Sequence, residues 1–264
     1  MAHYGDSMSR FGNLEFDGRT NRQSEDTTLV SDETRCLREA ETAFRGGDFE
    51  SALRQFARVL EYNPQSAAAW GGQVRMLIEL GEFAEAKRWA DNAVERFPHD
   101  AEVLAAKAVA LARLGDHKAA LAFSDAALAE GGETPYVWLA RGDVLLARAE
   151  KRADYCFTRA CSGAPLDWLW PWLASRVHYF HRKFSLALKL ISQAVALDGG
   201  QAVVWAQMGR CQFALGLAAA GVASFAQASQ RNPTCPDGLR AAEEWRDRSL
   251  WHRLVGGWRR WCQG

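Results

Sequence analysis

The sequence predicts an all-α protein, a right-handed superhelix of six antiparallel helix pairs followed by a C-terminal capping helix. A block of residues recurs every 34 positions, except for one interval of 33 between the fourth and fifth copies. The six copies start at Glu33, Ala67, Ala101, Pro135, Trp168 and Ala202. A repeat of this length is typical of stacked helix pairs, because one pair alone cannot bury its apolar face.

Each block divides into two helices at a tight turn. Four blocks carry a glycine there, a residue that ends helices readily because it enters the left-handed region: Gly47, Gly81, Gly115 and Gly216. Short oxygen-bearing residues precede the first helices and are predicted to cap them: Ser66, Asp100, Thr134 and Asp167. Prolines that cannot continue a helix close the blocks before them: Pro64, Pro98, Pro165 and Pro233.

Three segments are predicted along the chain. Residues 1–30 read as a disordered polar arm, residues 31–235 as the solenoid, and residues 236–264 as an amphipathic capping helix or tail. The arm has scattered arginines and acids and lacks the apolar stretch of a secretory signal. A short partner-binding motif around Phe11, Leu14 and Phe16 is an alternative interpretation of the arm.

From residue 33 to about 235 the blocks resemble the tetratricopeptide repeat. The resemblance rests on a large residue early in the first helix and on small residues at two places in the second helix. The large residues are Trp70, Leu104, Trp138 and Trp205, whereas Cys36 and Pro171 depart from the pattern. The first small place holds Ala52, Ala86, Ala120, Ala153, Ala187 and Gly221. Membership of this family would imply a non-enzymatic scaffold, adaptor or chaperone that binds a protein or peptide in its concave groove.

Composition favours a soluble protein without bulk attraction to nucleic acid. There are 32 basic and 32 acidic side chains, so the formal net charge is zero. The sequence lacks the roughly 18 consecutive apolar residues of a membrane-spanning helix. The six cysteines are dispersed and show no metal-binding spacing, which favours a reducing compartment and therefore the cytoplasm.

Motifs for catalysis and for cofactors are not found in the sequence. His178 and His181 lie three positions apart on one expected helix, but a third metal ligand is not evident nearby. The paired glycines belong to none of the known phosphate-binding loops. We therefore expect no enzymatic activity, no cofactor and no metal site.

Arginines gather at the places that face the groove in the resembling family. The expected groove contacts are Arg75, Arg113, Arg176 and Arg210, together with Trp172 and Tyr179. Because the arginine fork pairs with carboxylates, the partner is expected to be acidic or to offer a terminal carboxylate. Two alternatives stay open: the arginines pair with neighbours such as Glu79 or Asp143, and the tryptophans near Pro171 fill the core.

The last residues form an amphipathic pattern. One helical face would carry Trp251, Leu254, Trp258 and Trp261, and arginines lie opposite. A solenoid needs a polar-faced cap, which is one interpretation of this tail. The other is contact with a membrane surface or membrane complex, which would make the protein a membrane-associated assembly factor. The sequence leaves the oligomeric state open.

Overall fold

The computed structural model describes residues 26–241 and residue 243, and this part of the chain is built from helices without strands. The helices are α1 (Asp26–Arg45), α2 (Phe49–Tyr62), α3 (Ala67–Leu80), α4 (Phe83–Arg96), α5 (Ala101–Arg113), α6 (His117–Ala129), α7 (Pro135–Ala147), α8 (Ala153–Ser162), α9 (Leu169–Phe180), α10 (Phe184–Leu197), α11 (Ala202–Ala214) and α12 (Ala218–Arg231). Residues 236–241 form a further helical stretch. Consecutive helices pack as antiparallel pairs, which confirms the predicted all-α solenoid.

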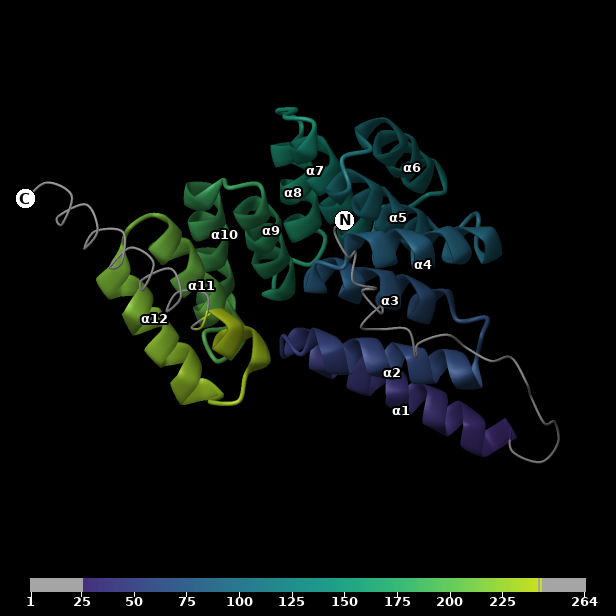
Figure 1. The fold of residues 1–264 in the computed structure, drawn as a ribbon, viewed down its shortest axis with the longest axis horizontal. Helices are drawn as coiled ribbons and strands as arrows, with labels where there is room; N and C mark the ends of the chain where they lie inside the picture. The colour runs from purple at the N-terminus through teal and green to yellow at the C-terminus, as the bar shows by residue number, and fades with distance from the viewer. Residues whose placement is uncertain (1–25, 242, 244–264) are drawn as a thin grey trace, which may run out of the picture.

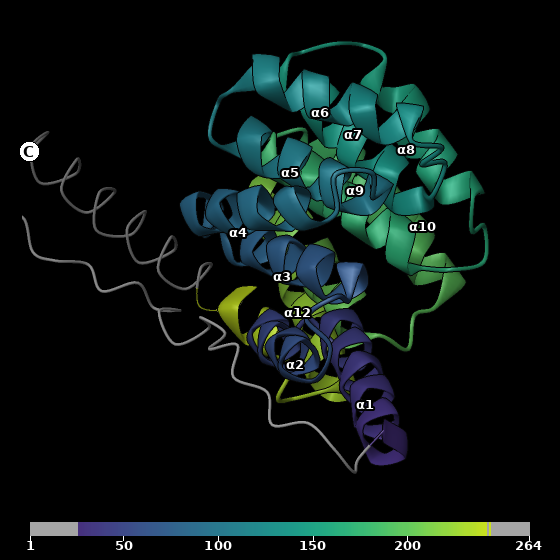
Figure 2. The same ribbon diagram turned by 90° about the vertical axis from the view of Figure 1, so that its right-hand side faces the viewer.

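The pairs follow one another around an arc. Figure 1 shows them in chain order from α1 and α2, through α7 and α8, to α11 and α12. The helical stretch after α12 lies beside the α2 end of the first pair, and the view in Figure 2 agrees. The arc therefore brings the two ends of the described chain close together.

Side-chain caps fix where the first helices begin. Ser66, Asp100 and Thr134 each accept the backbone N–H three residues further along the chain. The Asp167 carboxylate accepts the N–H of Leu169 at 3.1 Å. These side chains satisfy amide groups that have no partner inside the helix, so the chain enters α3, α5, α7 and α9 at defined residues.

The turn inside each pair places one residue in the left-handed region. In four pairs this residue is a glycine, with φ between +74° and +87°. In the fourth and fifth pairs the equivalent residues are Ala149, with φ of 56°, and Arg182, with φ of 59°. Side chains other than glycine adopt this conformation at a cost, so these two turns are strained relative to the others.

The second helices pack through small side chains. Ala52, Ala86, Ala120 and Ala187 are fully buried where each second helix meets its first helix. Around this seam lies a continuous core of aliphatic and aromatic residues that runs through all six pairs. Small residues at the seam let the helices approach closely, which explains why they recur with the repeat.

Helix α1 begins earlier than the first block. It starts at Asp26, so residues 26–30 of the expected arm are helical. The sequence from 26 to 45 contains neither glycine nor proline, and extending an existing helix is easier than starting one. Residues 1–25 and most of the expected C-terminal cap lie outside the described residues.

The fourth pair is irregular because its second helix is short. Helix α8 has 10 residues, whereas α2 and α10 have 14 each. The missing residue of the repeat falls before Ala153, so α8 lacks the first turn that other second helices have. A hollow of about 560 Å³ lies beside this end of α8, between α6 and α7.

Candidate partner-binding surface

The first helices of the pairs present a row of arginines toward the inside of the arc. Arg75 lies on α3, Arg113 ends α5, Arg176 lies on α9 and Arg210 lies on α11. These are the four arginines that the sequence places at the groove. The 34-residue repeat positions these arginines, since each occupies either the ninth or the thirteenth place of its block.

Each of three guanidinium groups lies over an aromatic ring from a neighbouring element. The carbon of the Arg75 guanidinium is 3.9 Å from the ring centre of Tyr136. Arg113 lies 3.5 Å from the ring centre of Phe180. Such contacts between a cation and an aromatic ring are favourable electrostatically. The third, Arg176, lies over Phe49 at 4.7 Å.

Asp143 on α7 is held between the guanidinium group of Arg113 and the ring of His181. Its Oδ2 lies 2.6 Å from Arg113 Nη2, and its Oδ1 lies 2.7 Å from His181 Nε2. Burial alone would raise the pKa of Asp143, but the charges and hydrogen bonds of Arg113 and His181 hold it below its usual value. Asp143 is therefore ionised at neutral pH although water does not reach it.

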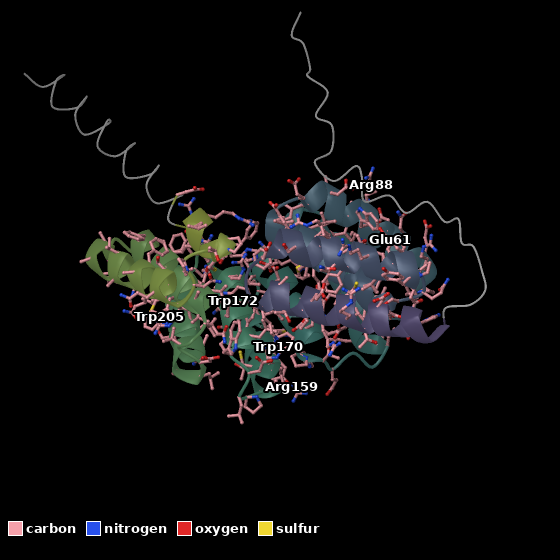
Figure 3. The ribbon with its side chains drawn as sticks, turned by 90° about the horizontal axis from the view of Figure 1, so that it is seen from below. Glu61, Arg88, Arg159, Trp170, Trp172 and Trp205 are labelled. Atoms are coloured by element: carbon pink, nitrogen blue, oxygen red, sulfur yellow. The ribbon has the colours of Figure 1, made fainter. Side chains whose placement is uncertain are left out.

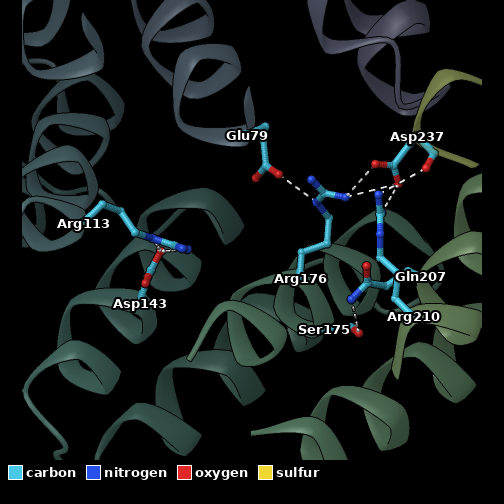
Figure 4. Close-up of polar contacts among 8 residues, drawn as sticks. All are labelled: Glu79, Arg113, Asp143, Ser175, Arg176, Gln207, Arg210 and Asp237. Carbon is cyan, nitrogen blue, oxygen red and sulfur yellow. Dashed lines mark hydrogen bonds and ion pairs between the residues drawn. The ribbon is translucent and has the colours of Figure 1, made fainter. Parts of the chain in front are cut away.

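Asp237, at the start of the helical stretch 236–241, is a carboxylate between two arginines (Figure 4). Arg210 Nη1 donates to its Oδ2 at 2.8 Å, and Arg176 Nη1 donates to the same oxygen at 3.2 Å. Arg176 also donates through Nε to Glu79 at 2.7 Å. Despite burial, these arginines hold the pKa of Asp237 below its usual value.

The first pair contacts the far end of the solenoid directly. Nη1 and Nη2 of Arg45 donate to the two oxygens of the Asp167 carboxylate, at 3.0 and 2.9 Å. A Cβ added at Gly47 would lie 2.7 Å from a methyl of Val203 and 2.9 Å from Cβ of Asp237. The backbone of the first turn thus lies against α11 and against the segment after α12.

This closure leaves little space on the inner face. The cavity there measures about 30 Å³. It is lined by Phe44, Arg75, Ile78, Glu79, Val109, Arg113, Tyr136, Leu139, Ala140, Asp143, Leu173 and Val177. A volume of that size holds one or two water molecules. This cavity is too small to hold a peptide.

The two aromatic residues that were expected in the groove, Trp172 and Tyr179, have different surroundings. Trp172 is fully buried, with its ring centre 6.2 Å from Phe44 and 6.3 Å from Phe49 (Figure 3). It therefore fills the core where the fifth pair meets the first, and its expected exposure to a partner is corrected. Tyr179 is half-buried and packs 5.3 Å from Phe184 at the turn of its own pair.

The arginines pair with carboxylates of other elements rather than with residues of their own helices. Pairing with Glu79 or Asp143 was the alternative that the sequence left open. Asp237 was missed because it lies beyond the last recognised block. A seventh 34-residue interval would start at residue 236, and Asp237 would be its second residue. This continuation of the period is the signal that could have found it.

The two histidines of α9 and its following turn have separate environments. His178 is buried against the ring of Phe157 at 4.5 Å, and His181 binds Asp143. Burial lowers the pKa of His178 to about 4, so its ring is neutral at physiological pH. Within the described residues, no three His, Cys, Asp or Glu side chains gather as metal ligands.

The hollow beside α8 is the larger open space on the outside of the solenoid. It is lined by Leu121, Asp125, Leu128, Trp138, Arg141, Leu145, Glu150, Arg152, Tyr155 and Cys156. Trp138 Nε1, on its wall, is buried and has no hydrogen-bond partner. The equivalent nitrogens of Trp70 and Trp205 donate to backbone carbonyls at 3.0 and 2.8 Å.

The expected tail contacts Trp251, Leu254, Trp258 and Trp261 lie outside the described residues. Among the helices that the structure does describe, none has the length and hydropathy needed to cross a membrane. The five cysteines in this part of the chain are free thiols.

Comparison with known proteins gives one family match and several structures of similar fold. Among curated proteins, none matches this sequence. A thermophilic tetratricopeptide-repeat protein of Thermus thermophilus is 19% identical with a TM-score of 0.47, over 80% of this chain and 97% of that one. The type IV pilus biogenesis factor PilW is 19% identical with a TM-score of 0.47, over 80% and 98%. YrrB, a tetratricopeptide-repeat protein with an unusual peptide-binding site, is 18% identical with a TM-score of 0.41, over 71% and 97%.

Residues 43–110 match the family model of the tetratricopeptide repeat, from the end of α1 through most of α5. The remaining described pairs repeat the same helix, turn and helix at nearly the same interval. This fold supports protein–protein interaction in general. Residues 43–110 are therefore a tetratricopeptide-repeat segment, and the other described pairs continue the same helical repeat.

Proposed function

We propose that this protein is a non-enzymatic scaffold, an adaptor or chaperone, that binds an acidic extended segment of a partner protein along its inner face. One observation supports this most strongly. Four repeats each contribute an arginine to the same face, and three of these guanidinium groups lie over aromatic rings. A row of oriented forks is suited to a chain of carboxylates.

The protein's own carboxylates support the same chemistry. Glu79, Asp143 and Asp237 each pair with an arginine of the row at 2.6 to 2.8 Å. The inner face therefore accepts carboxylates in a buried setting, where charge-assisted hydrogen bonds are stronger than in water. The ion pair between Arg75 and Glu102 is long, at 4.0 Å, and therefore weak. Arg75 is for this reason the arginine best placed to meet an outside carboxylate first.

Fluorescence anisotropy with a labelled ten-residue glutamate-rich peptide that has a free C-terminus tests this proposal. The control peptide carries glutamine in place of glutamate and an amidated end. We expect the acidic peptide to bind at least about fivefold more tightly at low salt and to lose most of this preference at high salt. Equal affinity for the two peptides at both salt concentrations would refute binding through carboxylates.

A matched pair of variants locates the binding face. Arg75→Gln removes a guanidinium whose side chain is 22% exposed on the inner face. Arg88→Gln removes one that is 53% exposed on α4, a second helix (Figure 3). We expect Arg75→Gln to weaken binding of the acidic peptide about threefold or more, and Arg88→Gln to leave it unchanged. Equal losses in the two variants would place the peptide elsewhere.

A second candidate function is that of a membrane-associated assembly factor that docks through the C-terminal tail. One feature of the described residues favours it. The sequence from 211 to 230 has no charged residue, and Leu217 and Val222 are exposed on or beside α12, close in sequence to the tail. An uncharged surface next to a tail rich in tryptophan and arginine is suited to a lipid interface.

Vesicle flotation separates the two candidates. The full chain and a variant lacking residues 249–264 are mixed with vesicles containing anionic lipid. Flotation of the full chain alone would support membrane docking by the tail. If the full chain stays in the soluble fraction, the membrane candidate is rejected and the scaffold proposal is unaffected. The five free thiols of the described residues suit a reducing compartment, and we propose a cytoplasmic location.

A further inference from the structure

Asp237 occupies the place that a partner's carboxylate would take. It is 2% exposed, and it meets Arg210 at 2.8 Å and Arg176 at 3.2 Å. A carboxylate that bridges two arginines is the arrangement expected when these arginines bind an acidic ligand. In this structure, however, the carboxylate comes from the protein's own chain.

We propose that Asp237 is an internal substitute for the partner's carboxylate, and that the segment 235–241 leaves the inner face when an acidic partner binds. The inference rests on the proposed function, because it concerns regulation of the same arginine row. It identifies Arg176 and Arg210 as a two-arginine carboxylate site that the free protein keeps occupied.

The segment is one of the elements that close the arc. Cys235 Sγ lies 3.7 Å from the carbonyl oxygen of Gly46, and Gly47 lies too close to Asp237 to carry a side chain. The segment therefore contacts the first pair as well as the arginines of α9 and α11. Moving it away would uncover Arg176 and Arg210 and would remove one of the contacts between the two ends of the arc, beside those of Arg45 with Asp167 and of Trp172 with Phe44.

Only one of the two buried carboxylates can be exchanged in this way. Asp143 lies within α7 and cannot leave Arg113 and His181 unless that helix unfolds. Asp237 lies one residue after the start of a helical stretch that follows a loop, and Leu239 in the same stretch is 53% exposed. The stretch is therefore held on one side only.

The charges make opening depend on the ligand. If Asp237 left without replacement, Arg176 would keep Glu79, but both arginines would lose the carboxylate that they share. Breaking these buried charge-assisted contacts is unfavourable, so the closed form is preferred in the free protein. A partner carboxylate that replaces Asp237 restores the balance, and the exchange then costs little.

The test compares Asp237→Asn with Asp125→Asn in the full-length protein, using the glutamate-rich peptide and anisotropy. Asp125 pairs with Arg141 on the outer side, and its side chain is 57% exposed, so this variant changes net charge equally without touching the inner face. We expect Asp237→Asn to bind the peptide about five- to tenfold more tightly than the unchanged protein, and Asp125→Asn less than about twofold more tightly.

Gly47→Ala gives an independent opening that leaves every charge in place, because its methyl group would collide with Val203 and Asp237. We expect it also to increase affinity for the peptide, and circular dichroism reports whether each variant is folded. If Asp237→Asn does not fold, the affinity of Gly47→Ala for the peptide decides whether displacing the segment increases binding.

The outcomes separate the two proposals. If neither the unchanged protein nor any variant binds the peptide, the proposed function fails, and this inference fails with it. If the unchanged protein binds and neither Asp237→Asn nor Gly47→Ala binds more tightly, the internal substitute is refuted while the scaffold proposal stands. An equal increase for Asp125→Asn and Asp237→Asn would also refute it, because net charge alone would explain the result.

Discussion

Single side chains on the inner face of the solenoid carry buried charge, and two buried carboxylates each contact two basic side chains. Asp143 has Arg113 and His181, and Asp237 has Arg176 and Arg210. Removing one partner from such a group leaves a charge away from water, which typically costs about 3–5 kcal/mol. These residues therefore specify how neighbouring repeats are aligned.

His178 predicts how stability depends on pH. Its pKa is lowered to about 4 by burial, whereas an unfolded histidine has a pKa of about 6.5. Between these values the unfolded chain binds a proton that the folded chain does not, so stability falls as the pH drops from about 6.5 toward 4. We expect a loss of about 2 kcal/mol in the free energy of unfolding between pH 7.5 and 4.5.

Urea unfolding of His178→Gln at both pH values checks this expectation. The variant should lose much less stability on acidification, whereas His99→Gln, which removes an exposed histidine, should behave like the unchanged protein. Asp143 and Asp237 do not confuse the comparison, since their lowered pKa values remove stability only below about pH 4. An equal acid loss in His178→Gln would show that another group is responsible.

The tryptophans of the first helices predict a second difference between residues. Trp70 Nε1 donates to the carbonyl of Pro64, whereas Trp138 Nε1 has no partner. Replacement by phenylalanine removes a hydrogen bond at residue 70 but none at residue 138. We expect Trp70→Phe to destabilise the protein by about 1 kcal/mol more than Trp138→Phe, measured by chemical unfolding. Equal costs, or a larger cost at Trp138, would contradict the assignment.

At the scale of helices and turns, much of the fold could be predicted from the capping residues and turn glycines in the sequence. Ser66, Asp100 and Thr134 cap first helices as expected, because a cap depends only on residues three positions apart. The start of α1 at Asp26 could not be located in this way. Several residues that could cap a helix lie close together here, among them Asp26, Thr27 and Ser31, so none of them alone marks the first helical residue.

The turns of the fourth and fifth pairs predict where the protein can be stabilised. Ala149 and Arg182 adopt the left-handed conformation that glycine takes in the other turns. Ala149→Gly relieves this strain, and we expect it to raise the free energy of unfolding by about 0.5–1 kcal/mol. Gly81→Ala, the reverse change in an open turn with φ of 83°, should lower it by about 1 kcal/mol. A loss of stability in Ala149→Gly would show that the turn is not strained.

The missing residue of the fourth repeat was visible in the sequence, but its consequence was not. Counting the interval of 33 residues indicates an irregular pair. Only the structure shows that the loss shortens α8 at its N-terminal end and leaves a hollow beside Tyr155. The alignment of a repeat marks where a residue is lost, whereas the surrounding packing determines which atoms leave space.

Across the whole molecule, the sequence predicted the row of arginines but not the closure of the arc. The row follows from the period, which puts equivalent residues on one face. Closure depends on the small rotation between successive pairs, and that rotation is set by packing over the entire chain. Contacts such as Arg45 with Asp167, 122 residues apart, therefore have no local signal. Binding of a partner to the row stays a prediction.

The closed arc is the central feature of this account, and a distance measurement across it tests the feature most directly. Spin labels are placed at Arg54→Cys on α2 and Ser229→Cys on α12, both exposed, with Cys161 and Cys262 replaced by serine. Double electron–electron resonance then gives the distances between the labels. We expect one narrow distribution for the free protein, a longer and broader one with the glutamate-rich peptide, and the longer distances in Asp237→Asn without peptide. An unchanged distribution under conditions where anisotropy reports bound peptide would contradict an arc that opens to admit its partner.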